Sequence, residues 1–118
     1  MAELRRDGDD LVVALSGAEK AEAVHGDIRV RMSSVSEVDV VDDVVHAVQG
    51  HKSVGAAWPG RFAIGSFRGD GKKTFAVVHH KTTRGVRVTL EGEDFDELVV
   101  GCEDPEEVAR EIGTSATS

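Results

Sequence analysis

The end of the chain carries its clearest local signal, a well-marked helix that follows a long series of strand-like segments. Asp104 can cap this helix, Pro105 suits its first position and Glu107 completes a capping box. Gly113 suits a left-handed stop, so the helix is predicted over residues 104–112. Many strands followed by one helix favour an antiparallel sheet on which the helix packs, over the alternating strands and helices of nucleotide-binding folds.

About seven short segments before the helix show the alternation of apolar and polar residues that is typical of strands. They cover residues 11–15, 28–33, 38–40, 62–67, 75–79, 86–91 and 98–101. The segments 28–33 and 38–40 repeat the same alternation around a short polar turn, and we expect them to pair with each other. Gly65 interrupts the alternation of its segment and is expected to mark a β-bulge.

Two short helices are predicted between the strands. Residues 18–25 are mostly strong helix formers, with Ser16 or Gly17 as the cap. Residues 44–49 form a one-sided helical turn. The stretch from residue 50 to residue 60 is expected to be the longest irregular segment, and long loops of this kind often carry function.

The chain fits a single domain. With 118 residues, 40% of them apolar, it is large enough to bury roughly two thirds of its unfolded surface in one core. We predict that this domain spans residues 10–112. The charged residues 1–9 are predicted to be a flexible leader, and residues 113–118 a flexible tail.

Composition argues against several classes of function. A formal net charge of -8 disfavours unaided binding to nucleic acid or anionic lipid, because both depend on clustered Lys and Arg. Aromatic residues make up only 4% of the chain and supply few platforms for base stacking. A single cysteine permits no intramolecular disulfide, and no apolar run suits a secretion signal or a membrane span, which together predict a cytoplasmic protein.

Two segments carry a resemblance to a known family. Residues 26–38, Gly-Asp-Ile-Arg-Val-Arg-Met-Ser-Ser-Val-Ser-Glu-Val, and the run from Leu98-Val99-Val100 through Glu103-Asp104-Pro105 resemble pleckstrin-homology domains. The similarity is greatest to small bacterial pleckstrin-homology-like proteins of uncharacterised function. It implies a mainly β (α+β) fold over residues 10–112, with about seven antiparallel strands in a partly open barrel and a capping C-terminal helix. The resemblance implies a fold and not an activity.

Basic residues give one candidate interaction site. Pleckstrin-homology domains that bind phosphoinositides use basic residues after the first strand, and here the matching residues 17–22 are net acidic. A better basic cluster is Arg68, Lys72 and Lys73 around an Asp-Gly turn, together with Arg61. It is interpreted either as a solvated hairpin tip or as a weak site for anionic lipid.

Residues suited to metal or nucleophilic chemistry do not form a recognisable set. The chain has five histidines without ligand spacing, namely His25, His46, His51, His79 and His80. Cys102 lacks an oriented base and is predicted to be an inert thiol. The acidic bend over residues 91–97 lacks the ligand order of a calcium loop. We therefore predict no catalytic residue, no cofactor and no metal.

Trp58 is the one bulky apolar residue among turn formers, and it is either an exposed anchor for a partner or a buried lid. The leading hypothesis is a non-enzymatic protein-binding or scaffolding module that engages another protein or itself through a sheet edge or the 50–60 loop. One alternative is a small ligand-binding barrel or enzyme with a pocket near Arg61 and His79. Another is weak recruitment to anionic lipid through Arg68, Lys72 and Lys73.

Overall fold

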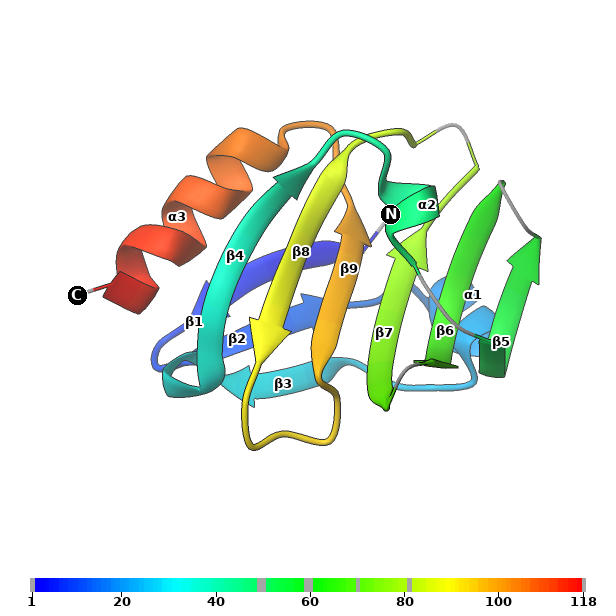
Figure 1. Cartoon of the computed structure of the whole chain (residues 1–118), viewed down its shortest axis with the longest axis horizontal. Helices are drawn as coiled ribbons and strands as arrows, with labels where there is room; N and C mark the ends of the chain where they lie inside the picture. Colours follow the sequence, from blue (N-terminus) through cyan, green and yellow to red (C-terminus); the bar gives the residue numbers. More distant parts are fainter. Residues whose placement is uncertain (1, 49–50, 59–60, 70, 81, 118) are drawn as a thin grey trace.

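The computed structural model describes residues 2–48, 51–58, 61–69, 71–80 and 82–117, with the backbone alone for residues 51–53 and 113–117 (Figure 1). Within these residues the chain forms nine strands, three α-helices and one 3-10 turn, η1. In chain order they are β1 (Glu3–Asp7), β2 (Asp10–Ala14), α1 (Gly17–Ala23), β3 (Ile28–Arg31), η1 (Met32–Ser34), β4 (Val35–Val41), α2 (Val44–Ala47), β5 (His51–Trp58), β6 (Phe62–Gly69), β7 (Lys72–Val78), β8 (Gly85–Leu90), β9 (Glu97–Gly101) and α3 (Pro105–Thr117). The predicted mainly β class is confirmed.

The described strands form two sheets and no closed barrel. The small sheet has the order β1-β2-β3, and the large sheet has the order β4-β8-β9-β7-β6-β5. Neighbouring strands are antiparallel except β7 and β9, which run parallel. Helix α3 packs against β4 and β8 of the large sheet and against β1 (Figure 1). The prediction that the C-terminal helix packs on a β-scaffold is therefore confirmed.

The prediction that segments 28–33 and 38–40 pair with each other is wrong. Strand β3 pairs with β2, and β4 pairs with β8 in the other sheet. Between them η1 redirects the chain from one sheet to the other, with Met32 buried in the core. Strand β3 alternates buried and exposed residues, whereas no residue of β4 is fully buried, and neither pattern identifies the partner strand. This division into two layers replaces the barrel that the resemblance implied.

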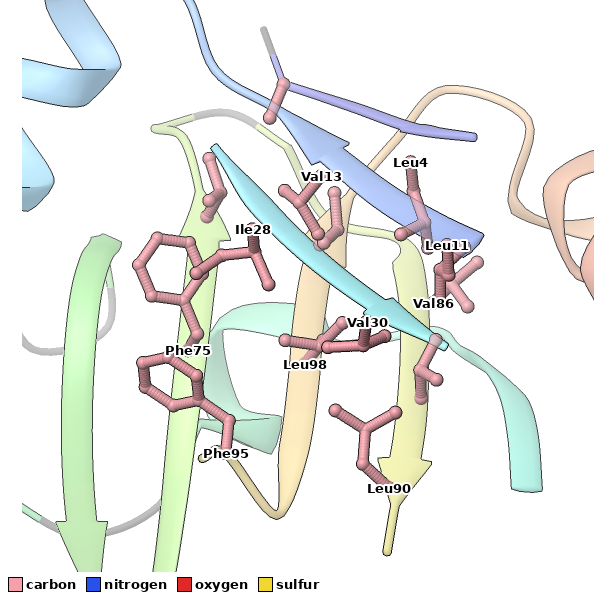
Figure 2. Close-up of a cluster of buried hydrophobic side chains, with 14 of the residues drawn as sticks. Leu4, Leu11, Val13, Ile28, Val30, Phe75, Val86, Leu90, Phe95 and Leu98 are labelled. Atoms are coloured by element: carbon pink, nitrogen blue, oxygen red, sulfur yellow. The ribbon is translucent and has the colours of Figure 1, made fainter. Parts of the chain in front are cut away.

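The two sheets pack face to face around an aliphatic core (Figure 2). The strands of the small sheet run across those of the large sheet (Figure 1). The largest contributions are Leu4, Leu11, Val13, Ile28 and Val30 from the small sheet, and Phe75, Val86, Val88, Leu90 and Leu98 from the large sheet. Each such side chain adds about 1.5–3 kcal/mol to the free energy of unfolding when it is fully buried.

The opposite face of the large sheet has a smaller second core. Val44 of α2 is completely buried there, together with Ala63, Phe67, Val78 and Val99. Strand β9 is consequently buried on both faces. This explains why its sequence is a continuous apolar run and not an alternating one.

Both capped helices begin as predicted, but the last one ends differently. In α1 the Ser16 hydroxyl accepts a hydrogen bond from the Glu19 amide, and the Glu19 carboxylate accepts one from the Ser16 amide. In α3 the Asp104 carboxylate accepts a bond of 3.3 Å from the Glu107 amide. The predicted stop at Gly113 is wrong, because α3 continues to Thr117. Glycine inside a helix costs only about 1 kcal/mol relative to alanine, so it does not force an end.

The flexible leader predicted over residues 1–9 is wrong for its described part, residues 2–9. Residues Glu3–Asp7 form β1, which pairs with β2 along its whole length. Ala2 and Leu4 are buried in the main core. In residues 2–7 these two apolar side chains are surrounded by charged ones. The segment therefore has too few apolar residues to show the alternation that is typical of a strand. The folded unit therefore includes residues before the predicted boundary at residue 10.

The irregular loop predicted over residues 50–60 is wrong for its described part. Residues His51–Trp58 form β5, the last strand of the large sheet, which pairs with β6. Residues 49–50 and 59–60 lie outside the described part of the chain. An edge strand buries little surface, and β5 consequently lacks the apolar alternation by which the other strands were predicted.

Gly65 and Gly55 face each other across the β5–β6 hairpin, with φ angles of 137° and 135°. A Cβ atom on Gly65 would lie 2.3 Å from the carbonyl oxygen of Val54, and one on Gly55 would lie equally close to that of Ile64. The strands can approach this closely only because both residues are glycines. The register shift of the hairpin lies in β5, just before Val54, so the bulge predicted at Gly65 is in the partner strand.

The glycine pair gives a test of this hairpin. We expect Gly65→Ala to lower the free energy of unfolding by about 3 kcal/mol or more, because alanine combines an unfavourable φ with a backbone collision. Chemical denaturation measures the change. Gly26→Ala is the matched control, since a Cβ there meets nothing within 4 Å, and it should change stability by less than about 0.5 kcal/mol. If both substitutions changed the free energy of unfolding equally, that would contradict the close approach of β5 and β6 at Gly65.

Candidate functional site

The larger of two described cavities is an open groove of about 570 Å³ on the inner face of the large sheet. Its lining comes from the end of α1, from strands β5, β6 and β7, and from the loop between β8 and β9. The lining residues are Val24, His25, Val54, Ser66, Arg68, Lys73, Asp94 and Phe95. A smaller cavity of about 190 Å³ shares His25, Asp94 and Phe95 and extends along β3. The groove thus combines apolar and basic side chains.

Arg68 and Lys73 face each other directly across the β6–β7 hairpin. Directly opposed residues lie on the same face of a sheet, and like charges in that arrangement lower stability. Among the described residues neither side chain forms an ion pair, although Asp94 lines the same groove. Lys72, predicted to belong to the same cluster, is exposed on the opposite face of β7, because adjacent strand residues alternate.

Three rings pack together at one side of the groove. The centroid of Phe75 lies 5.2 Å from that of His25 and 5.4 Å from that of Phe95. Figure 2 shows the two phenyl rings side by side. The Lys73 ammonium lies 4.8 Å from the centroid of the Phe95 ring, within the range of a cation–π interaction. The groove therefore places a cation next to an aromatic surface.

The loop that carries Phe95 is anchored to β7 by the next residue, Asp96. Its amide donates to the Lys73 carbonyl oxygen at 2.7 Å, and the Lys73 amide donates to its carboxylate at 2.8 Å. Its carbonyl oxygen accepts a bond of 2.8 Å from the Leu90 amide. The acidic bend is thus a structural loop that fixes one wall of the groove.

Val24 ends α1 in a left-handed conformation, with φ 53° and ψ 45°. This conformation is unfavourable for a β-branched residue, and the side chain is 68% exposed at the edge of the groove. The turn is followed by His25, whose Nδ1 lies 2.8 Å from the Gly26 carbonyl oxygen. A carbonyl oxygen only accepts, so Nδ1 carries the hydrogen and Nε2 is not used in this bond.

The strain at Val24 is testable. We expect Val24→Gly to raise the free energy of unfolding by about 0.5–1 kcal/mol, because glycine adopts this conformation without penalty and the exposed side chain buries little surface. Val40→Gly is the control, since Val40 is also exposed but lies in an extended strand, and it should lower stability. Urea denaturation of both variants measures the difference. A loss of stability in both would contradict the assignment of strain.

Helix α1 is held on the sheet by a buried carboxylate. Glu19 is 1% exposed, and its carboxylate is hydrogen-bonded to Nε2 of His79, the residue that follows β7. Burial would raise the pKa of Glu19, but the hydrogen bonds from His79 and Ser16 outweigh burial and lower that pKa. Glu19 is therefore a carboxylate at neutral pH, and it fixes the helix whose end lines the groove.

The buried carboxylate predicts a pH-dependent contribution to stability. At neutral pH we expect Glu19→Gln to lower the free energy of unfolding by about 1–3 kcal/mol, whereas Glu22→Gln on the exposed face of α1 should have little effect. Because folding lowers the Glu19 pKa, the contribution is present above the unfolded value of 4.5 and is lost as the pH falls through the folded pKa. Denaturant titrations over this range measure it. If the difference in the free energy of unfolding between the wild type and Glu19→Gln stayed constant as the pH fell, that would contradict this role of the Glu19 carboxylate.

The other predicted site residues do not meet in one place. Trp58 is 61% exposed near the end of β5, so it is not a buried lid. Arg61 is exposed in the turn between β5 and β6, where its amide donates to the Trp58 carbonyl oxygen. Neither described cavity is lined by Arg61 or His79. The pocket hypothesised around these two residues remains a prediction, and so does lipid binding through a cluster that the sheet divides between two faces.

The metal and thiol hypotheses can be compared with the geometry. Among the described residues, no three histidine, cysteine, aspartate or glutamate side chains are grouped closely enough to hold a metal ion. His46 pairs with Asp43, at 2.7 Å. Burial raises the pKa of Cys102, and the nearby Asp104 and Glu106 raise it further, with Arg84 acting in the opposite direction. The thiol is therefore protonated at neutral pH, and its inertness stays a prediction.

Three residues that shape the groove or its support were not predicted as parts of one site. The role of Glu19 at the start of α1 could have been predicted, because Ser16 and Glu19 have the spacing of a capping box. The contact between His25 and Phe95 could not have been predicted from local sequence, because it depends on how α1 and the loop before β9 pack on β7.

Comparison of the chain with protein-family models, with curated protein sequences and with solved structures gave no match. None of the helices in the described part of the chain is long and apolar enough to cross a membrane.

Proposed function

We propose that this protein is a non-enzymatic binding module that holds an extended segment of a partner protein along strand β5. The proposal rests on one observation: β5 ends the large sheet, and no described strand pairs with its outer edge. The strand at the opposite edge, β4, is flanked by α3 (Figure 1). An unpaired edge offers backbone N–H and C=O groups to an incoming strand.

The side chains of β5 support the proposal. Val54 and Trp58 are 46% and 61% exposed and share one face of the strand. Large aromatic side chains contribute most of the binding energy in many interfaces. Edge strands that avoid pairing usually carry charges or proline. Lys52 is such a charge near the start of β5, but residues 54–58, Val-Gly-Ala-Ala-Trp, have neither.

Charge favours another protein over a second copy as the occupant. Each copy has a formal net charge of -8, so two copies repel each other. A neutral or basic segment meets no such repulsion.

The resemblance to pleckstrin-homology-like proteins is part of the same proposal, supported by the mainly β architecture with a C-terminal helix packed on a sheet. We also propose a cytoplasmic location, which the single unpaired cysteine supports.

The test is a selection of peptides of about ten residues, the upper range of strand lengths, from a displayed random library. We expect enriched peptides to protect the backbone amides of residues 54–58 from hydrogen exchange and to shift the fluorescence of Trp58, the single tryptophan. Trp58→Lys should weaken binding about tenfold or more in calorimetric titrations.

Val40→Lys is the matched control, since it removes an exposed apolar side chain from the strand at the opposite edge. It should leave peptide affinity unchanged. Protection confined to other strands, or equal losses in both variants, would contradict pairing at β5. A stable dimer in light scattering would show that a second copy occupies the edge.

A further inference from the structure

The groove differs in charge from the molecule around it. The chain has a formal net charge of -8, yet the groove lining contains Arg68 and Lys73 with Asp94 as its one carboxylate. Arg68 and Lys73 are directly opposed, and neither has an ion-pair partner among the described residues. The pairing itself is unfavourable, because two like charges stand at directly opposed positions, and of the two side chains Lys73 has a favourable contact with the Phe95 ring.

We propose that the groove binds a carboxylate joined to an apolar body, with the carboxylate between Arg68 and Lys73 and the body against Phe95, Val24 and Val54. An anion between the two cations removes their repulsion and forms charge-assisted hydrogen bonds with both. The apolar lining residues include the 68% exposed Val24 and the 46% exposed Val54, which would lose contact with water on binding.

Size and charge narrow the class of ligand. A volume of about 570 Å³ is within the range of small-molecule sites, roughly 300–1,000 Å³. The two cations and the Asp94 carboxylate together leave one formal positive charge. This balance suits a monoanion such as a carboxylate better than a phosphate dianion, which would face the Asp94 carboxylate with one charge unneutralised.

This site is distinct from the proposed pairing at β5, although Val54 lies in that strand and also lines the groove. The carboxylate contacts side chains on the inner face of β6 and β7, whereas an added strand contacts the backbone at the outer edge of β5. Trp58 does not line the groove. Trp58→Lys should therefore leave carboxylate binding intact, and loss of one function does not imply loss of the other.

The experiment is an NMR titration of the amide resonances with phenylacetate. We expect saturable shifts at residues 24–25, 68, 73 and 94–95, with phenylacetamide and acetate each binding at least about tenfold more weakly, since one lacks the charge and the other the apolar body. Phenyl phosphate should not bind more tightly than phenylacetate. N-acetylphenylalanine distinguishes the two natural sources of this chemistry, because tighter binding than phenylacetate identifies a peptide C-terminus and weaker binding identifies a free acid.

Three variants localise the binding. Arg68→Gln and Lys73→Gln should each weaken phenylacetate about tenfold or more. Lys72→Gln removes the same charge from the other face of the same strand and should leave the affinity within about twofold. Arg68→Gln should also keep or raise the denaturation midpoint, because it removes the like-charge pair, so a loss of affinity in that variant is not a loss of folding.

The proposal is overturned if phenylacetate gives no saturable shifts, if its neutral amide binds equally well, or if phenyl phosphate binds more tightly. It is also overturned if all three variants weaken binding equally, since that would show a response to net charge and not to this groove.

Discussion

Packing of the small sheet across the inner face of the large sheet is the interaction on which the rest of the structure depends. Leu11 and Val13 are completely buried against the large sheet in the same core as Leu98. The small sheet covers the part of the large sheet around β8 and β9, and α1 packs against β6 and β5 (Figure 1). A helix of seven residues is too short to cover those strands completely. The groove is the part of the inner face that neither element fills.

Three unfavourable local features lie in or near this groove. Val24 has a left-handed backbone, Arg68 opposes Lys73, and Trp58 is exposed on the neighbouring edge strand. At the other end of the large sheet, Arg87 pairs with Asp39 across β8 and β4. Strained or unfavourable local structure tends to occur at functional sites of proteins, where residues are arranged for ligand binding and not for stability. The hydrogen bond between the buried Glu19 and His79 fixes α1, whose end lines the groove.

Seven of the strands and all three helices were predicted from local patterns, since burial of one face leaves alternating or helical spacing in the sequence. Strands β1 and β5 were missed for the same physical reason, because they contribute few apolar side chains to either core. The basic cluster was predicted in part. Arg68 and Lys73 could be identified as basic residues near a turn, but the exclusion of Lys72 depends on the register of the hairpin.

The starts of the two capped helices and seven of the strand segments could be predicted from the sequence, because they depend on residues within a few positions of one another. Tertiary structure alone decided that β3 and β4 belong to different sheets, and that β7 and β9 run parallel. It also brought Val24, Phe95 and Lys73 to one groove. These outcomes depend on which faces of the elements pack together and exclude water. That packing involves all the elements at once, so the apolar periodicity of a single segment does not reveal it.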